Sequence, residues 1–469
     1  MSVRESKGHS RKGAVSFRSI NPHCPSEVVG EFEEAGPSGV ETAVGRARKA
    51  YLDWREEPAP TRSDALARIA EDIEKWSEAL AQLVVREVGK PIDEARTEIS
   101  NAVSILHSYS RRMLALQEET HVTESSRYWS VSRRYPVGVC AFLTPWSSPV
   151  ALPMSKAAPA LGFGNTIVLK PAPASTVVAG TLGTIVAQHL PEGAFELVTG
   201  NVETGKPLVD HPDVAAVSFA GSMEVGRLVA QQVAARGAKV HCEMGGQNSS
   251  VVLANADLDA AAETIACAAM GYAGQKYTST SRVIVEDAVY ERLRDRLVST
   301  VEAMWVTNPE NELCQVGPLI NERAQYSALE AVERSHGRAL TGGEVLDHDG
   351  FYLAPTLVEV DNPMDHLAQK EVFAPVATLL RAASAEEALR IANCGRRGIV
   401  AAVFSDDLEE AMTFAERLEV GLVLTNAATS RIDHGASFSV LERPSADPKE
   451  WDNAAADFFT ENRTLLVPR

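Results

Sequence analysis

The chain has 469 residues, which is too long for one ordinary core and predicts two or three lobes. Its formal net charge of −18 repels polyanions, and no basic stripe interrupts that charge, so we expect no nucleic-acid partner. A composition of 45% hydrophobic and 23% charged residues, with no apolar run of about 18 residues, is typical of a soluble protein and argues against a membrane span.

The N-terminus carries basic residues with no hydrophobic segment behind them, which predicts a loose tail over residues 1–16 of a cytoplasmic protein. The six cysteines show no CxxC or other metal-ligand spacing, so thiols in a reducing compartment and no metal site are expected. Cys242, in a predicted strand, and Cys267, on an apolar predicted helix, are expected to be buried.

Apolar residues recur at steps of three and four from residue 61 to 88 and predict an amphipathic helix that ends at the break Gly89-Lys90-Pro91. A second helix is expected to follow to about residue 117. Between residues 137 and 253, short apolar runs alternate with alanine-rich stretches. This alternation predicts βαβ units and a parallel sheet, with a ligand at the carboxyl ends of its strands.

A second α/β lobe is expected from the turn MGGQNSS to about residue 425. It should contain an alanine-rich helix over 258–272 and a strand over 282–286. The last segment, FFTENRTLLV, predicts a β arm.

Three segments lie where a parallel sheet would meet a ligand, and each alone is a weak signal. VSFAGSMEVGR places Gly221 and Ser222 between a strand and a helix, where backbone N–H groups can bind a pyrophosphate or merely form a tight turn. VLKPAPAST ends a strand at Lys170, which either bonds ribose hydroxyls or lies exposed at an edge. HCEMGGQNSS ends another strand with Glu243 beside a glycine pair, where a carboxylate can act as a general base.

In their order and spacing, these segments resemble the aldehyde dehydrogenase superfamily. The resemblance extends over roughly residues 25 to 426 and is highly specific. The motifs that carry it are PW (145–146), KPA (170–172), FAGSMEVG (219–226), EMGG (243–246), GQK-x-T-x-x-SR (274–282), EVFAP (371–375) and GLVLTN (421–426).

The resemblance implies an α/β fold with three parts. A Rossmann-like parallel-sheet domain that binds NAD or NADP would comprise residues 1–117 and 137–246. A second α/β domain over 247–426 would carry the catalytic loop, and residues 118–136 and 455–469 would form a small β oligomerisation arm. Family members are usually homodimers or homotetramers, so the implied partners are a small aldehyde-like or imine-like substrate and further copies of the chain.

The resemblance also implies roles for single residues. Lys170 would contact the adenosine ribose, while Gly221, Ser222 and the following helix with Val225 would cradle the pyrophosphate. Glu243 would be the general base. The other residues that the resemblance places at the cofactor are Trp146 in the cofactor channel, Ala172 beside Lys170, and Glu371 and Phe373 beside the nicotinamide ribose.

The departures from the family pattern lie at the reacting centre. In such enzymes a cysteine thiolate attacks the aldehyde, and an asparagine with a backbone N–H holds the oxyanion. Here Tyr277 takes the cysteine's place and Ser147 the asparagine's. A phenol with a pKa near ~10 is a poor nucleophile, and losing one oxyanion donor commonly costs ~10²–10³ in rate, so thioester-forming dehydrogenation is not expected.

Two further differences affect the ligands. The family's ribose-binding glutamate is Pro173 here, which removes a 2′-hydroxyl partner and a repulsion against a 2′-phosphate, so NADP is as plausible as NAD. The family's Gly-Gly loop has no counterpart over 427–451, so the wall of the substrate tunnel should differ. Neither Cys242, on the far face of a strand, nor Cys267 is well placed to replace the missing nucleophile.

Three hypotheses follow. The first is an oxidoreductase that moves hydride between a nicotinamide and a carbonyl, imine or carbinol without a covalent intermediate, with Tyr277 as proton donor or acceptor, Ser147 as its hydrogen-bond partner and Glu243 as an accessory base. The second is a catalytically silent dinucleotide-binding protein or scaffold in which Tyr277 fills the old site. The third is non-redox acid/base chemistry, of the lyase or isomerase type, in the same pocket.

Overall fold

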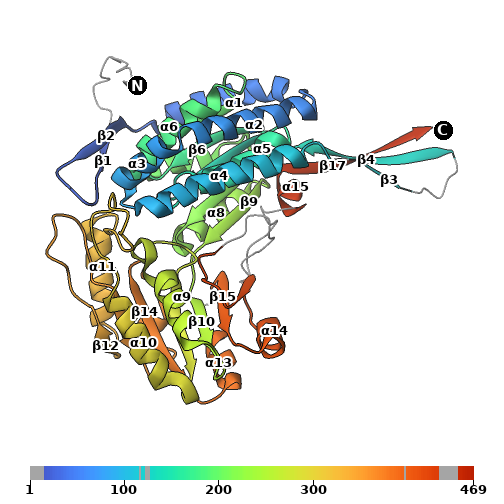
Figure 1. The fold of residues 1–469 in the computed structure, drawn as a ribbon. Helices are drawn as coiled ribbons and strands as arrows, with labels where there is room; N and C mark the ends of the chain where they lie inside the picture. Colours follow the sequence, from blue (N-terminus) through green and yellow to red (C-terminus); the bar gives the residue numbers. More distant parts are fainter. Residues whose placement is uncertain (1–14, 116–117, 122–126, 396–397, 432–452, 469) are drawn as a thin grey trace.

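The computed structural model describes residues 15–115, 118–121, 127–395, 398–431 and 453–468. Figure 1 shows two α/β lobes, one above the other, and a three-stranded arm that projects from the upper lobe. The described part of the predicted N-terminal tail is residues 15 and 16, where the first strand already begins. The structure therefore has the predicted α/β architecture.

A five-stranded parallel sheet with the order β7-β6-β5-β8-β9 forms the centre of the upper lobe. The order reverses between β5 and β8, and such a switch point is where open α/β sheets bind ligands. The strands are β5 (Val139–Thr144), β6 (Thr166–Pro171), β7 (Phe195–Leu197), β8 (Val214–Gly221) and β9 (Lys239–Met244).

Helices cover both faces of this sheet. Successive side chains of a strand point to opposite faces, so a strand of apolar residues contributes to a core on each side. Cys140 and Phe142 of β5 pack in one core, while Ala141 and Leu143 pack in the core on the opposite face. The helices of this lobe are α1 (Gly36–Trp54), α2 (Ala59–Lys75), α3 (Ser77–Val88), α4 (Ile92–Arg112), α5 (Ala151–Gly162), α6 (Thr176–Ala187), α7 (Val202–Asp210) and α8 (Met223–Ala235).

The prediction of one continuous helix over 61–88 is wrong, because α2 and α3 are separate. Trp76, between them, has φ −98° and ψ 11°, outside the helical region. The hydrogen bonds from Trp76 N to Asp72 O and from Leu80 N to Trp76 O nevertheless continue through the break, so the apolar period does not reveal it. Gly89 ends α3 in the left-handed conformation, with φ 69°, as the sequence predicts.

A seven-stranded sheet with the order β12-β13-β14-β11-β10-β15-β16 forms the lower lobe, and all its pairs except β12–β13 are parallel. The predicted helix over 258–272 and strand over 282–286 match α9 and β11 closely. The strands are β10 (Asn248–Val252), β11 (Thr280–Glu286), β12 (Arg338–Thr341), β13 (Thr356–Glu359), β14 (Val376–Ala382), β15 (Val400–Phe404) and β16 (Leu422–Thr425). The helices are α9 (Leu258–Met270), α10 (Tyr290–Glu302), α11 (Glu322–Glu333), α12 (His366–Gln369), α13 (Ala385–Ala392) and α14 (Leu408–Glu416).

The arm consists of β3 (Glu118–His121), β4 (Tyr128–Pro136) and β17 (Thr460–Pro468), in the order β17-β4-β3. Strands β4 and β17 pair antiparallel over their whole length, as Figure 1 shows. The helix α15 (Asn453–Phe459) precedes β17, so the predicted arm begins with a helical turn. A separate hairpin is formed by β1 (Ser16–Ile20) and β2 (Val28–Glu33).

No helix in the described part of the chain is long and apolar enough to cross a membrane. The segment 427–451, for which the sequence predicts a different tunnel wall, lies outside the described residues beyond residue 431.

Candidate functional site

A cavity of about 320 Å³ lies where the two lobes meet, within the usual size of a small-molecule site. Its walls come from both lobes. The lining residues are Pro145, Trp146, Ser147, Leu152, Ala220, Gly221, Ser222, Glu243, Gly245, Tyr277, Glu371 and Phe373.

The two sheets deliver these residues from opposite strand ends. Trp146 and Ser147 follow the carboxyl end of β5, and Gly221 ends β8, so the switch point of the first sheet forms one wall. Tyr277 comes three residues before β11 and Phe373 three residues before β14, at the amino ends of the second sheet. The structure thus brings together residues that lie more than 200 positions apart in the sequence.

Tyr277 is half-buried at this cavity, and its backbone is fixed from β10. Asn248 Nδ2 donates to Tyr277 O at 2.9 Å and to Ser279 O at 3.0 Å. Burial raises the pKa of the Tyr277 phenol well above its ordinary value, and the carboxylates of Glu243 and Glu98 raise that pKa further. A phenol with a raised pKa stays protonated at neutral pH, so it is able to donate a hydrogen bond and is a weak nucleophile.

A buried ion pair holds Ser147. Lys90 Nζ donates to Ser147 O at 2.8 Å and is paired with the Glu98 carboxylate. Glu98 Oε1 also accepts from the N–H groups of Val150 at 2.7 Å and Ala151 at 3.0 Å, at the start of α5. The loop that presents Ser147 is thus anchored on one side by a cation and on the other by a helix terminus.

Lys156 is a neighbour of Glu243 that the sequence analysis missed. Its Nζ lies 3.5 Å from Glu243 Oε1, and its side chain is only 1% exposed. A single lysine in the otherwise uncharged helix ALPMSKAAPALG is the signal that could have found it, because a buried ammonium needs a nearby acid.

Two of the residues that line the cavity, Trp146 and Phe373, form an aromatic cluster with the buried Tyr272. Trp146 packs edge-on against Phe373, with ring centroids 5.7 Å apart, and against Tyr272, with centroids 6.4 Å apart. Phe373 and Tyr272 have φ angles of 56° and 52°, in the left-handed region that non-glycine residues seldom adopt. Such backbone strain clusters at functional sites.

The features at β8 and β9 fit a dinucleotide. A Cβ at Gly221 would lie 2.7 Å from the Phe219 ring, so only glycine fits this turn. Ser222 caps α8 by accepting from Val225 N at 3.4 Å, and the N-terminus of this 13-residue helix favours an anion. A Cβ at Gly245 would lie 2.1 Å from both carboxylate oxygens of Glu371, so glycine lets this acid reach the cavity.

Three predicted cofactor residues lie outside the lining of this cavity. Val225 is on the exposed first turn of α8, and Ala172 N donates to Thr144 O at 2.9 Å. Lys170 Nζ donates to Pro171 O at 3.0 Å and Gly200 O at 2.8 Å, and burial lowers its pKa to about 8. Lys170 lies near the end of β6, Ala172 follows β6 and Val225 lies in the helix after β8, so all three are at the carboxyl edge of the first sheet.

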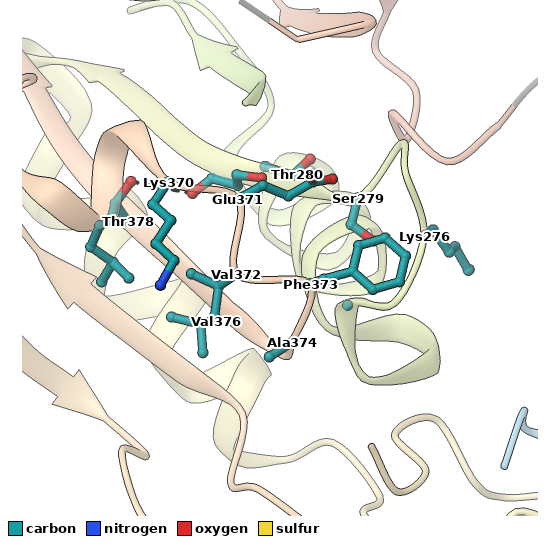
Figure 2. Close-up of a pocket in the computed structure, with 13 residues that line it drawn as sticks. Lys276, Ser279, Thr280, Lys370, Glu371, Val372, Phe373, Ala374, Val376 and Thr378 are labelled. Atoms are coloured by element: carbon teal, nitrogen blue, oxygen red, sulfur yellow. Dashed lines mark hydrogen bonds between the residues drawn. The ribbon is translucent and has the colours of Figure 1, made fainter. Parts of the chain in front are cut away.

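A second, much smaller cavity lies beside the segment 370–376, and it shares Glu371 and Phe373 with the larger cavity. Figure 2 shows the side chains of Glu371, Phe373 and Ser279 around it, on segments that precede β14 and β11. Its volume is about 10 Å³, close to that of one water molecule, so a nicotinamide ring does not fit there. The larger cavity is therefore the candidate reaction site.

None of the described cysteines lines this cavity. Cys242 is buried under α8, where its Sγ donates to Gly226 O at 3.5 Å, as the sequence predicts. Cys267 is exposed on α9, so the prediction that it is buried is wrong: its neighbours Ala266 and Ala268 face the core, and the helix turns Cys267 outward. Among the described residues, no group of three or more His, Cys, Asp or Glu side chains could hold a metal ion.

Comparison with known proteins assigns this architecture. Residues 9–464 match the model of the aldehyde dehydrogenase family. The chain is 34% identical over 459 residues to an α-ketoglutaric semialdehyde dehydrogenase of Bacillus subtilis, covering 95% of this chain and 93% of the relative. It is 33% identical over 426 residues to a 1-pyrroline-5-carboxylate dehydrogenase of Anoxybacillus flavithermus, covering 87% and 81%.

The fold is likewise similar to solved structures. The NAD-dependent aldehyde dehydrogenase of Sinorhizobium meliloti superimposes with a TM-score of 0.94 at 30% identity, covering 97% of this chain and 92% of that one. HpcC of Thermus thermophilus superimposes with a TM-score of 0.92 at 32% identity, covering 97% and 90%.

Proposed function

Because the chain belongs to the aldehyde dehydrogenase family, we propose that it is an NAD(P)-dependent oxidoreductase that works without a covalent intermediate. It would transfer hydride directly to or from a small carbonyl, imine or carbinol. One observation carries the proposal: Tyr277 lines the same cavity as Gly221, Ser222 and the strained Phe373.

The reaction that fits these groups is a reversible carbonyl or imine reduction. When bound, the nicotinamide supplies the hydride to the carbon, or accepts it in the reverse direction. The protonated Tyr277 hydroxyl donates a hydrogen bond to the substrate oxygen or nitrogen and then its proton, which yields an alcohol or amine. Ser147 would orient this contact. Glu243, which lies 3.5 Å from Lys156 Nζ, would be the accessory base that accepts the phenol proton in the oxidation direction, and in the reduction direction a proton from water would restore the phenol.

A covalent route is not supported by these residues. Acyl transfer needs a nucleophile, and a phenol whose pKa is raised by burial is a weak one. No cysteine is among the residues that line the cavity in the described part of the chain.

The cofactor would lie along the carboxyl edge of the first sheet. In this proposal Lys170 and Ala172 contact the adenosine, Gly221, Ser222 and Val225 hold the pyrophosphate, and Trp146, Glu371 and Phe373 enclose the nicotinamide riboside. The dinucleotide domain would then be 1–117 with 137–246, and the catalytic domain 247–426.

The test uses NADH and NADPH with a panel of carbonyls and imines. The panel includes α-ketoglutaric semialdehyde and 1-pyrroline-5-carboxylate, the compounds named for the two relatives. Tyr277→Phe should lower kcat by about 10²-fold or more, the usual effect of a lost proton donor, and leave the Kd of the reduced cofactor unchanged. Tyr290→Phe is the matched control, because the Tyr290 hydroxyl bonds Glu359 in the lower lobe and should not affect turnover.

Two results would contradict the proposal. Unchanged turnover in Tyr277→Phe would remove the tyrosine from the reaction. Tight cofactor binding without oxidation by any member of the panel would instead favour a silent dinucleotide-binding protein, or non-redox chemistry by Glu243 and Tyr277.

A further inference from the structure

We propose that Glu34, at the end of the N-terminal hairpin, bonds the adenosine ribose and makes the site selective for NAD over NADP. The inference rests on the proposed function, since it assumes a dinucleotide beside Lys170. The family's ribose-binding glutamate is Pro173 in this chain, and Glu34 would provide the missing carboxylate from another segment.

Glu34 is firmly attached to the turn that precedes α7. Its Oε1 accepts from Asn201 N at 3.0 Å and from Asn201 Nδ2 at 2.9 Å. The adjoining backbone is fixed to the same turn, because Ala35 N donates to Thr199 O at 2.8 Å and Gly36 N donates to Thr204 Oγ1 at 3.2 Å. The carboxylate therefore has a defined position rather than that of a loose surface side chain.

Lys170 reaches the same turn from β6. Its Nζ donates to Gly200 O at 2.8 Å, and a Cβ on Gly200 would lie 3.3 Å from Cγ of Glu34. The Glu34 carboxylate also raises the pKa of the Lys170 ammonium, partly offsetting the effect of burial, which is the larger one. The Lys170 ammonium and the Glu34 side chain thus both lie close to Gly200.

This pair can recognise a ribose diol but disfavours a phosphate. Two hydrogen-bond donors of Lys170 already serve backbone carbonyls, which leaves one for a ribose oxygen. A 2′-hydroxyl can donate to Glu34, whereas a 2′-phosphate carries between one and two negative charges and would be repelled by the carboxylate. Because Pro173 has no charge, the acidity of this subsite depends on Glu34.

The experiment titrates the full-length wild type, Glu34→Gln and Glu33→Gln with NADH and with NADPH, following nicotinamide fluorescence. The Glu34→Gln change keeps an oxygen that can accept from Asn201 and removes the charge with little change in size. Glu33→Gln is the matched control, since it removes the same charge from an exposed side chain one residue away.

We expect the wild type to bind NADH about tenfold or more tightly than NADPH, a ratio that corresponds to about 1.4 kcal/mol. Glu34→Gln should lower this ratio about tenfold, mainly by improving NADPH binding, while Glu33→Gln leaves it unchanged. The wild-type ratio should also fall as salt is added, because salt screens the repulsion.

Two other sets of results would contradict the inference. Equal wild-type affinities, or an unchanged ratio in Glu34→Gln, would overturn the role of Glu34 while leaving the dinucleotide site intact. Failure of both cofactors to bind the wild type would overturn the proposed function, and the inference with it. Thermal melting curves should match for the three proteins, which would show that differences in cofactor affinity do not arise from unfolding.

Discussion

At the candidate reaction cavity, the proposed function depends on two side chains. Tyr277 presents a protonated phenol, and Ser147 is held by a carbonyl contact with Lys90 rather than by its hydroxyl. The surrounding backbone is anchored by Asn248 and Glu98 independently of these two side chains. The anchored loops should therefore tolerate a change of reactive group.

We predict that Tyr277→Cys combined with Ser147→Asn gains aldehyde oxidation. The double variant regains a thiol nucleophile and an amide donor for the oxyanion, and it should exceed the Tyr277→Cys single variant by about 10²-fold. Reduction of NAD⁺ with an aldehyde measures the gain, and peptide mass mapping after alkylation shows the reactivity of the new thiol. Equal rates for the two variants would mean that position 147 does not reach the oxyanion.

The sequence could identify Tyr277, Ser147 and Glu243 because each lies within a continuous motif. It could not identify Glu34 or Lys156, whose partners lie far away along the chain: Glu34 and Lys170 are 136 positions apart. Neither residue lies in a motif. The contacts of Glu34 arise only when its segment packs against α7 and β6, and that of Lys156 only when α5 lies beside β9.

At the level of elements, Glu87 joins two helices of the upper lobe. This α3 residue accepts from Val177 N at 2.8 Å and Val178 N at 2.7 Å at the start of α6. Burial raises its pKa from 4.5 to about 7, although the N–H groups of α6 oppose the shift. A buried carboxyl thus takes the place of a local cap for α6.

This shift predicts how stability depends on pH. The folded-state pKa is raised, so the contribution of Glu87 is fully present below pH 4.5 and is lost as the pH rises through 7. The loss amounts to about 3 kcal/mol, because one pKa unit corresponds to about 1.4 kcal/mol. Glu87→Gln should remove this part of the dependence of stability on pH. Melting temperatures measured between pH 4.5 and 7.5 test this. Parallel curves for the variant and the wild type would refute the assignment to Glu87.

The ends of helices were predicted best where a residue type favours a particular backbone conformation. Gly89 marks the end of α3 because its left-handed φ suits glycine. The break between α2 and α3 at Trp76 could not be predicted in this way. Trp76 is apolar and fits the helical period of the sequence, although its side chain is exposed. The alternation of apolar runs predicts the parallel strands. Their order in the sheet could not be predicted, because it depends on contacts between distant segments.

At the level of the whole molecule, the arm carries an apolar face that is partly exposed in the single chain. Trp129 pairs with Val467, and Val131 pairs with Leu465, so these side chains share one face of the ribbon. Trp129 is 51% exposed and Val467 46%. A second copy of the chain would cover this face, in agreement with the homodimer or homotetramer that the family resemblance implies.

We predict that Trp129→Glu combined with Val467→Glu converts the oligomer to monomers. Two added carboxylates on the contact face oppose its burial, while the cores of both lobes remain unchanged. Light scattering after size-exclusion chromatography measures the mass, and Thr464→Glu, on the opposite face of β17, is the control. A wild-type protein that is already monomeric would contradict the assignment of this face.

The family resemblance implies a reactive cysteine at the position of Tyr277, and this difference would affect how the protein withstands oxidants. A low-pKa thiolate is oxidised by peroxide to sulfenic and then irreversibly to sulfinic acid, which ends thiol-dependent catalysis. Here Cys242 is buried under α8, and burial raises the pKa of the Cys314 thiol to about 12, which makes it inert. Hydride transfer assisted by a phenol would therefore continue under oxidative stress that inactivates an enzyme with a catalytic thiolate.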